Sequence, residues 1–479
     1  HAPTNSTCCR SAGASAEKSG QSSLHCRRLP HGNPSMPPAL RGRTWYESIG
    51  SPKYVLAPMV DQSEHSWRVL CRRHGTDLCY TPMISSRQFA ESELYRKTMY
   101  GPLEGLASSE DAPVVVQFAG NDPDVLLAAA KHVQHRCSAV DINFGCPQKI
   151  ARRGHYGAWL SDEPQLQQQL VGALHCHLDC PVTVKIRVQE AGRSATVDYA
   201  RMLQGAGASL VTVHGRTREQ KGAVQGAADW DMIAAVKGAV SVPVFANGGI
   251  EVPADVGRCL EATGADGVMV GEGLLDNPAM FEDLRSGAHA RAASLPRGAL
   301  QIALAREYVE LQESYPADLR SVKQHLFTLL YAHLQVHWDL RERMHKARTL
   351  EDMSAVINEC DERPAEAPET RVPFCNVPGD SYTSWYKRHT WEAKRHALRQ
   401  AEKELQRQQE DDTTHGEADG VSAADGEYSS AEPRLSKGQR KRRKKEEREK
   451  ARALQQREEA ESMTCHDGLK RDEGEDVQP

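Results

Sequence analysis

Residues of the types that do proton and anion chemistry follow short apolar runs at several places between residues 48 and 290. A Gly-Cys-Pro turn places Cys146 directly after one run, while Lys185 and His214 end two others. If these side chains converge, the two cations would tune the proton affinity of the thiol. Paired glycines after the last two runs let backbone N–H groups approach an anion, and these are Gly248, Gly249, Gly271 and Gly273. The sequence therefore predicts a reactive cysteine close to a phosphorylated ligand.

Eight apolar runs carry these residues and have the length of strands: Tyr54–Ala57, Leu78–Thr81, Val114–Phe118, Ala139–Asn143, Val182–Ile186, Leu210–His214, Val244–Asn247 and Gly267–Gly271. The segments between them are long enough for crossover helices, as in 66–74, 124–135, 165–177, 196–205, 230–239 and 252–263. Eight strand–helix units predict an α/β fold, a (β/α)8 TIM barrel with its active site at the C-terminal strand ends. A doubly wound sheet, which usually has fewer strands, is the second choice.

Composition divides the chain into four regions. Residues 1–47 are rich in Ser, Gly, Pro and Arg and read as a disordered leader, and 48–292 form the barrel. Residues 297–362 repeat leucines at helical spacing and predict a small all-α domain of three or four helices. Residues 363–479 form a mostly disordered, charged tail, because they hold too little apolar material to offset ordering entropy.

Charge and cysteine usage exclude several classes of protein. The net charge of -5 argues against a globally basic nucleic-acid binder but not against a basic patch. The 13 cysteines show no disulfide framework and read as reduced thiols of an intracellular protein. No apolar run is long enough to span a membrane. The cluster at residues 175–180 resembles only half a zinc site, so we expect no metal.

The motifs after the strands resemble, in order and over roughly residues 53–345, those of the tRNA-dihydrouridine synthases. The motifs are Ala57-Pro58-Met59-Val60-Asp61-Gln62-Ser63 with Trp67-Arg68, Val116-Gln117-Phe118, Asn143-Phe144-Gly145-Cys146-Pro147-Gln148-Lys149 with Gly157-Ala158, Lys185-Ile186-Arg187, Thr212-Val213-His214-Gly215-Arg216-Thr217 and Phe245-Ala246-Asn247-Gly248-Gly249. The runs 153–158 and 214–222 look like those of the eukaryotic subgroup that acts on positions 16 and 17 of the D-loop.

The resemblance implies a flavin barrel that reduces the C5–C6 bond of uridine in tRNA. Cys146 matches the general acid that protonates C5, and Lys185 would stabilise negative charge on the reduced flavin. NADPH would be the reductant, which agrees with the missing dinucleotide-binding fingerprint. Glu272 stands where many members have an arginine, so the phosphate contact there would come from backbone. The residues that match FMN contacts are Pro58, Met59, Val60, Gln117, Lys185, His214, Asn247, Gly248, Gly249, Gly271 and Glu272.

A uridine in folded tRNA must be turned out to reach a barrel mouth, and lysines and arginines would bind the phosphates. On the rim we expect substrate contacts from Asn143, Lys149, Arg153, Arg187 and Arg216, with Arg152, Arg218 and Lys221 nearby. In the helical domain, i+4 steps would place His333, His337, Arg341 and His345 on one helix face. We expect Arg341 and Lys323 to contact tRNA, and a merely solvated face is the alternative.

Two other functions remain open. One is a flavin barrel that acts on a free pyrimidine, like dihydroorotate dehydrogenase, and the other is a catalytically silent RNA-binding protein on the same scaffold. The basic rim and helical domain argue against the first, and the intact Cys146, Lys185 and His214 argue against the second. We expect a monomer in the cytoplasm, with the nucleus as a second location. The basic cluster 434–452 is an RNA contact, a nuclear address or a soluble tail.

Overall fold

The computed structural model describes residues 40–100, 109–221, 226–285 and 298–363. All of them belong to the first of two units into which the chain divides, 1–404 and 405–479. The leader up to residue 39 and the tail from residue 364, with its basic cluster, lie outside the described residues. Within the described ranges, no helix is long and apolar enough to cross a membrane.

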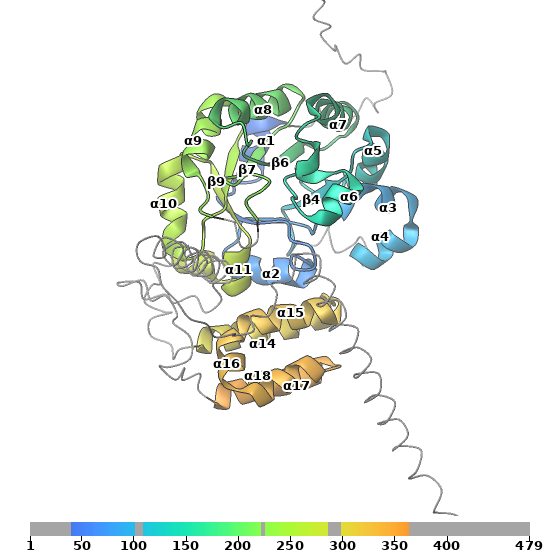
Figure 1. The fold of residues 1–479 in the computed structure, drawn as a ribbon. Coiled ribbons are helices and arrows are strands. Elements are labelled where there is room, and N and C mark those ends of the chain that lie inside the picture. Colours follow the sequence, from blue (N-terminus) through green and yellow to red (C-terminus); the bar gives the residue numbers. More distant parts are fainter. Residues whose placement is uncertain (1–39, 101–108, 222–225, 286–297, 364–479) are drawn as a thin grey trace, which may run out of the picture. The chain divides into compact units, whose positions relative to one another are not determined.

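Parallel strands form a closed barrel in the centre of this unit (Figure 1). In the order β2-β1-β9-β8-β7-β6-β5-β4 each strand pairs with the next, and the β2–β4 pairing closes the ring. A short β3, Ile84–Ser85, pairs with β4 outside the ring. The predicted TIM barrel is therefore confirmed, with its strands β1 Tyr54–Leu56, β2 Leu78–Tyr80, β4 Val114–Ala119, β5 Ala139–Phe144, β6 Val182–Arg187, β7 Val211–His214, β8 Val244–Asn247 and β9 Gly267–Val270.

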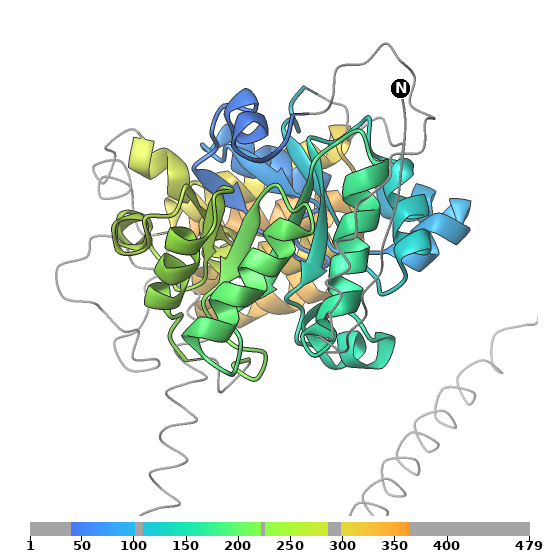
Figure 2. The ribbon, with the colours of Figure 1, turned by 90° about the horizontal axis from the view of Figure 1, so that it is seen from above.

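Helices surround the strands, as the view from above shows (Figure 2). Local sequence starts several of them: the Asp122 side chain accepts the N–H groups of Asp124 and Val125 at the start of α5, and Asp229 caps α9. The helices of the barrel are α2 His65–Arg73, α3 Ser86–Glu91, α4 Glu93–Tyr100, α5 Pro123–Lys131, α6 Lys149–Gly154, η2 Gly157–Leu160, α7 Pro164–His177, α8 Arg193–Gly205, α9 Trp230–Ala239, α10 Pro253–Thr263, α11 Glu272–Asp276 and α12 Met280–Arg285.

A helix that precedes the first strand covers apolar side chains of the barrel interior. In α1, Gly42–Ser48, Trp45 and Tyr46 are buried together with Phe245 and Met269. The Tyr46 hydroxyl donates to the carbonyls of Pro52 and Asp266, each at 3.1 Å. The expectation of a disordered leader up to residue 47 is therefore wrong for residues 42–47, because their two aromatic side chains belong to the core.

Between residues 298 and 363 the structure describes five helices after the barrel: α14 Ala299–Ser314, α15 Leu319–Leu329, α16 Tyr331–Val336, α17 Trp338–Lys346 and α18 Leu350–Glu362. The sequence predicted three or four helices. The number is larger because short breaks at Leu330 and His337 divide one stretch of helical apolar spacing into separate helices. In Figure 1 these helices lie beside α2 and α11, which α14 and α15 contact.

Glu64, the N-cap of α2, joins the barrel to these helices. Its carboxylate accepts the Tyr308 hydroxyl at 2.6 Å and lies 3.1 Å from Nε2 of the buried His325. The buried Trp67 of α2 packs edge-on against the Tyr308 ring. The five helices are therefore anchored next to the loop that follows β1.

Candidate active site

A chain of buried hydrogen bonds crosses the barrel interior below Cys146. Thr183 Oγ1 donates to Asp141 Oδ1 at 2.6 Å, and Gln117 Nε2 donates to Asp141 Oδ2 at 2.8 Å. Asn143 Nδ2 in turn donates to Gln117 Oε1 at 2.8 Å. We call these four residues the polar chain. All are buried, so each hydrogen bond replaces one that water would make outside the barrel.

The polar chain ends on the turn that carries Cys146. Asn143 Oδ1 accepts the N–H groups of Gly145 at 3.0 Å and of Cys146 at 2.8 Å. On the other side of the turn, Ala158 N donates to the Cys146 carbonyl at 3.1 Å. Gly157 has φ +68°, and a Cβ there would lie 2.8 Å from the same carbonyl. The position of the thiol is therefore determined from both sides, and Gly157 is required sterically.

Burial raises the pKa of Cys146 above its usual range, although the charges of Arg187, Lys185 and Lys221 oppose the shift. The thiol therefore keeps its proton at neutral pH. A protonated thiol among cations suits an acid better than a standing nucleophile, because the cations stabilise the thiolate that forms after the proton leaves.

The imidazole of His214 is not one of these cations. Burial and the neighbouring Lys185, Arg187 and Arg216 lower the pKa of His214 well below its usual value. Its Nε2 lies 3.2 Å from Nη1 of Arg216, and a guanidinium only donates, so Nε2 accepts and Nδ1 carries the proton. The expectation that a charged His214 tunes Cys146 is therefore wrong.

Lys185 lies between the thiol and the loop after β8. In the paired strands Asn143 is opposite Lys185, and His214 is opposite Asn247. Lys185 Nζ donates to Asn247 Oδ1 at 2.7 Å, and Asn247 Nδ2 donates to the Met269 carbonyl at 2.8 Å. Burial and the charge of Arg187 lower the pKa of Lys185 to about 7. An anionic ligand beside Nζ would restore the charge.

The loops after β8 and β9 approach the site with backbone alone. Gly248 has φ +100°, and a Cβ there would lie 2.8 Å from Cδ2 of His214. Gly249 has φ +78°, and its Cβ would lie 3.2 Å from Nε1 of Trp230. We call Gly248, Gly249, Gly271 and Gly273 the glycine cradle. Gly273 has a packing role as well, since a Cβ there would lie 2.8 Å from the Ile250 carbonyl.

Arg216 lies beside the glycine cradle and not on the outer rim. Its Nε donates to the Gly226 carbonyl at 3.0 Å and its side chain contacts His214, while only 8% of the residue is exposed. The charges of Glu272 and Glu251 oppose the fall that burial causes in its pKa. The predicted tRNA contact does not suit so buried a side chain, and Arg216 instead supplies positive charge on the cradle side.

The loop after β1 completes this side of the site. Met59 N donates to Ser63 Oγ at 3.0 Å, and the Ser63 carbonyl accepts Nη1 of Arg68 at 2.8 Å. Arg68 is held by Asp111 through a buried ion pair of 2.6 Å. The sulfur of Met59 would lie 3.4 Å from a Cβ on Gly271. Met59 therefore lies beside Gly271 of the cradle. Of the other residues predicted on this side, Pro58 is partly buried, and Val60 and Glu272 are exposed.

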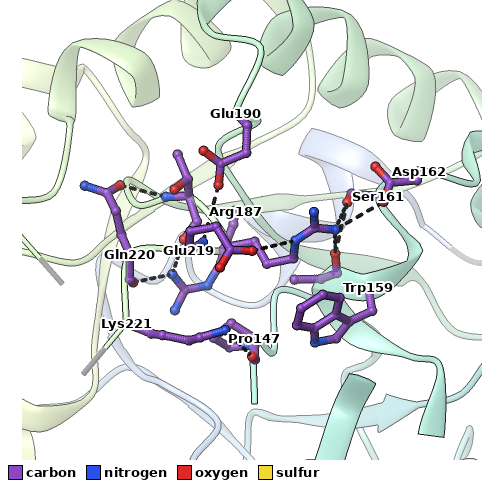
Figure 3. Close-up of polar contacts among 12 residues, drawn as sticks. Pro147, Trp159, Ser161, Asp162, Arg187, Glu190, Glu219, Gln220 and Lys221 are labelled. Atoms are coloured by element: carbon purple, nitrogen blue, oxygen red, sulfur yellow. Dashed lines mark hydrogen bonds and ion pairs between the residues drawn. The ribbon is translucent and has the colours of Figure 1, made fainter. Parts of the chain in front are cut away.

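Arg187 connects two loops of the rim. Its Nε donates to the Gly145 carbonyl at 2.8 Å, and its Nη1 donates to the carbonyls of Thr217 at 2.8 Å and Gln220 at 3.2 Å. It therefore holds the loop after β7 against the cysteine turn (Figure 3). Lys149 and Arg153 lie exposed on α6, where solvent and a large substrate can reach them.

The predicted basic face of the helical region is wrong in one respect. α16 ends at Val336 and α17 begins at Trp338, so the four residues spaced by i+4 do not share one helix. His333 is 2% exposed, and burial together with the charge of His337 lowers its pKa to about 4. Arg341 lies on α17, with Cζ 5.6 Å from the ring centroid of Phe327. Lys323 Nζ donates to the His345 carbonyl at 2.9 Å.

Trp159 was not predicted as a site residue from the sequence, and three cationic side chains of the rim lie close to its ring. Its ring centroid lies 5.1 Å from Cζ of Arg152, 4.7 Å from Cζ of Arg218 and 5.3 Å from Nζ of Lys221. We call these four residues the indole cluster. Trp159 Nε1 donates to the Gln148 carbonyl at 3.3 Å, two residues after Cys146. The sequence held a signal for this residue: an aromatic side chain follows Gly-Ala, precedes a helix start and has three cations near it in the sequence.

Asp141 and Thr183 were also missed. Asp141 stands in an otherwise apolar strand two residues before Asn143, so its side chain points to the same face. That spacing was the signal for a buried acid. Burial raises its pKa to about 6. Among the residues described, no group of three or more His, Cys, Asp or Glu side chains could hold a metal. Seven cysteines among the described residues carry free thiols.

Comparison with known proteins agrees with this geometry. The sequence model of the dihydrouridine synthase family matches residues 55–366. A Mus musculus protein named tRNA-dihydrouridine(16/17) synthase (NAD(P)(+))-like is 45% identical over 348 residues, which cover 71% of this chain and 69% of that protein. The Saccharomyces cerevisiae tRNA-dihydrouridine(16/17) synthase is 43% identical over 322 residues, 66% of this chain and 74% of that protein.

A Homo sapiens protein named tRNA-dihydrouridine(20a/20b) synthase-like is 40% identical over 230 residues, 47% of this chain and 70% of that protein. The family match includes both the barrel strands with the polar chain and the five helices that follow. With the cysteine turn, Lys185 and the glycine cradle in place at one end of the barrel, the chain belongs to the dihydrouridine synthase family.

Proposed function

We propose that this protein reduces uridine to 5,6-dihydrouridine at positions 16 and 17 of the tRNA D-loop, with FMN in the barrel mouth and NADPH as the reductant. The observation that carries the proposal is the position of the Cys146 thiol, held by the polar chain on the same rim as Lys185 and the glycine cradle. The positions come from the relatives named for 16 and 17, which align with more of this chain than the relative named for 20a and 20b.

The donor set supports a flavin mononucleotide. Gly248, Gly249 and Gly273 of the cradle present backbone where a side chain would crowd its neighbours. Arg216 adds a cation beside the cradle, so a phosphate suits this place. Lys185 and Asn247 would lie at the isoalloxazine, where an ammonium stabilises negative charge. The neutral His214 can offer its Nδ1–H as a donor without adding to the charge.

When bound, the reduced flavin supplies a hydride to C6 of the uracil ring. Cys146 holds the proton that C5 needs. As the C5=C6 double bond is lost, the S–H bond of Cys146 breaks and a C5–H bond forms, which leaves a thiolate. Arg187, Lys185 and Lys221 stabilise this thiolate electrostatically, and a proton from solvent restores the thiol.

The tRNA would reach the site across the rim formed by α6, η2 and the loop after β7. Lys149, Arg152 and Arg153 are exposed there, and phosphate contacts of this kind supply most of the affinity for nucleic acid. Lys323 and Arg341 remain candidates for a second contact by the helical region. A free pyrimidine needs neither surface, which disfavours the small-molecule alternative.

The test uses the full chain loaded with FMN, NADPH and a tRNA transcript that lacks modifications. We expect dihydrouridine at positions 16 and 17, located by mass spectrometry of nuclease fragments. A transcript with cytidine at both positions is the control and should yield no dihydrouridine in that fragment. Product at 20a and 20b alone would reject the assigned positions, and flavin reduction without any product would reject the proposed function.

A further inference from the structure

A cavity of about 460 Å³ lies beside the cysteine turn, outside the ring of strands. Phe144, Val188, Tyr199 and Met202 form its apolar part, and the first three are at most 8% exposed. Its polar part includes Gln189, Glu190 and Arg218. Its volume and its mixture of an apolar surface with a few polar groups are typical of sites for small organic groups.

The cavity is adjacent to the catalytic turn. Phe144, in its wall, is two residues before Cys146, and Arg187, also in its wall, donates to the Gly145 carbonyl at 2.8 Å. The guanidinium of Arg187 therefore lies between the turn and the cavity. A base in the cavity and a base at the turn would therefore lie on either side of the Arg187 side chain.

The indole cluster borders the same cavity. Arg218 lines the cavity and also lies over the Trp159 ring, with its Nη1 3.1 Å from Ser161 Oγ and 3.2 Å from Asp162 Oδ2 (Figure 3). Its Nε is 3.4 Å from a carboxylate oxygen of Glu219. Because two carboxylates partner Arg218, the cations left for a phosphate are Arg152 and Lys221. Lys221 Nζ donates to the Pro147 carbonyl at 3.0 Å and has further donors.

We infer that this cavity is a second nucleotide site, which binds the base next to the uridine in the catalytic pocket while Arg152 and Lys221 bind the phosphate. The inference rests on the proposed function, in which two adjacent positions, 16 and 17, are substrates. When one of the two bases is turned out into the barrel mouth, its neighbour loses a stacking partner. An unstacked base in a loop is bound through an apolar surface and through its hydrogen-bonding edge.

The polar groups suit a pyrimidine edge. The Gln189 amide and the Glu190 carboxylate can accept a ring N–H, and Gln189 and Arg218 can donate to a carbonyl oxygen. The apolar wall accepts dihydrouracil as well as uracil, since it makes no demand for a planar ring. The site can therefore bind the neighbouring base before or after that base has been reduced, provided that the neighbour lies on the cavity side.

The cavity lies on one side of the cysteine turn only, so it can bind the neighbour of one of the two positions but not of the other. Filling it should therefore slow one position selectively. Ala195, on α8, is partly buried and lines the cavity. Ala195→Leu and Ala195→Trp fill it in two steps. Gln168→Trp, on an exposed position of α7 outside the cavity, is the matched control.

The experiment compares the full FMN-loaded chain and these three variants on an unmodified tRNA transcript. It measures the initial rate at each position and the tRNA affinity by fluorescence anisotropy. For Ala195→Leu we expect the ratio of the two rates to change about tenfold, as for extra methylenes in an apolar site, with weaker tRNA binding. Gln168→Trp should retain the wild-type ratio and affinity, and flavin reduction by NADPH should be the same in every variant.

An unchanged ratio of rates and unchanged tRNA affinity in Ala195→Leu would overturn the second site, whatever happens to Ala195→Trp. The leucine variant decides because its side chain is small enough for the protein still to fold. An equal loss at both positions would also overturn it. If the wild-type protein makes no dihydrouridine, the proposed function is wrong, and tRNA affinity alone then decides whether the cavity binds RNA.

Discussion

The indole of Trp67 and the imidazole of His325 stack with their centroids 3.7 Å apart and their planes within 12°. One ring belongs to α2 of the barrel and the other to α15 of the helical region. Below the stack, Glu64 accepts hydrogen bonds from Tyr308 and contacts His325. The barrel and the helices that follow it thus share a buried, partly charged contact two residues from the loop after β1.

Replacing His325 by phenylalanine should keep the stack and remove one of the two partners of the Glu64 carboxylate, while Tyr308 stays. Leaving one buried group unsatisfied costs roughly 1–3 kcal/mol, so the free energy of unfolding should fall by about that amount in urea titrations. Tyr308→Phe removes only a hydroxyl from the same carboxylate and should cost less. Equal stability of His325→Phe and wild type would show that the contact between Glu64 and the imidazole contributes nothing.

The same carboxylate gives a pH dependence. Although burial opposes it, His325 holds the pKa of Glu64 below its usual value. The stabilisation is therefore present above the unfolded pKa and is lost as the pH falls through the folded one. Wild-type stability should decline more steeply than that of His325→Phe as the pH falls below about 5, measured by the urea midpoint. Parallel declines would contradict the assignment.

Cys146→Ala should separate the two half-reactions. NADPH should still reduce the flavin, because the thiol takes no part in that step, while dihydrouridine formation should fall by about 10²–10⁴-fold without an acid. Single-turnover mixing of the reduced protein with tRNA measures the second step alone. Wild-type product formation by the variant would exclude Cys146 as the acid.

Asn143→Ala removes the acceptor for two N–H groups of the cysteine turn and leaves the thiol itself in place. We expect slower product formation with little change in tRNA affinity, because the turn loses its fixed position. Asn143→Asp restores the acceptor and should recover part of the rate. A variant with wild-type rate would show that Gly157 and Ala158 suffice to hold the turn.

Lys185→Met should change how the stability of the flavin-free protein depends on pH. The pKa of Lys185 is about 7 in the folded protein, against about 10.4 when exposed, so the unfolded chain binds more protons between these values and wild-type stability rises with pH there. The variant lacks this rise and should be the more stable protein at pH 7. Urea titrations at pH 7, 8 and 9 compare the two slopes, and identical slopes would contradict the shift.

The barrel could be predicted because its strands are short apolar runs, and polar residues or glycines stand at or just after the ends of most of them. The positions of Lys185, His214 and Asn247 at strand ends also placed them correctly on one rim, since parallel strands in register carry their ends to the same side. The helix α1 was missed because its only core residues are Trp45 and Tyr46, in a stretch whose composition is otherwise that of a linker.

Charge states and surface exposure could not be predicted from spacing. His214 and Arg216 lie two residues apart in a motif full of basic residues, yet one is neutral and the other is buried. His333 fits an i+4 pattern in the sequence. In the structure the helix breaks at His337, and the His333 side chain is buried beside Gly298. Each of these outcomes depends on which distant segment covers the side chain, and no local pattern records that.

The polar chain has a consequence for how this scaffold can be altered. It ties the position of the sulfur to three strands of the barrel wall, through Thr183, Asp141 and Gln117, and not to the outer loops alone. The loop after η2 and the loop after β7 can therefore be exchanged for those of relatives that modify other positions while the acid stays where it is. In this architecture, the choice of the modified position and the delivery of the proton depend on separate parts of the protein. A chimera with grafted loops should therefore modify a different tRNA position by the same reaction.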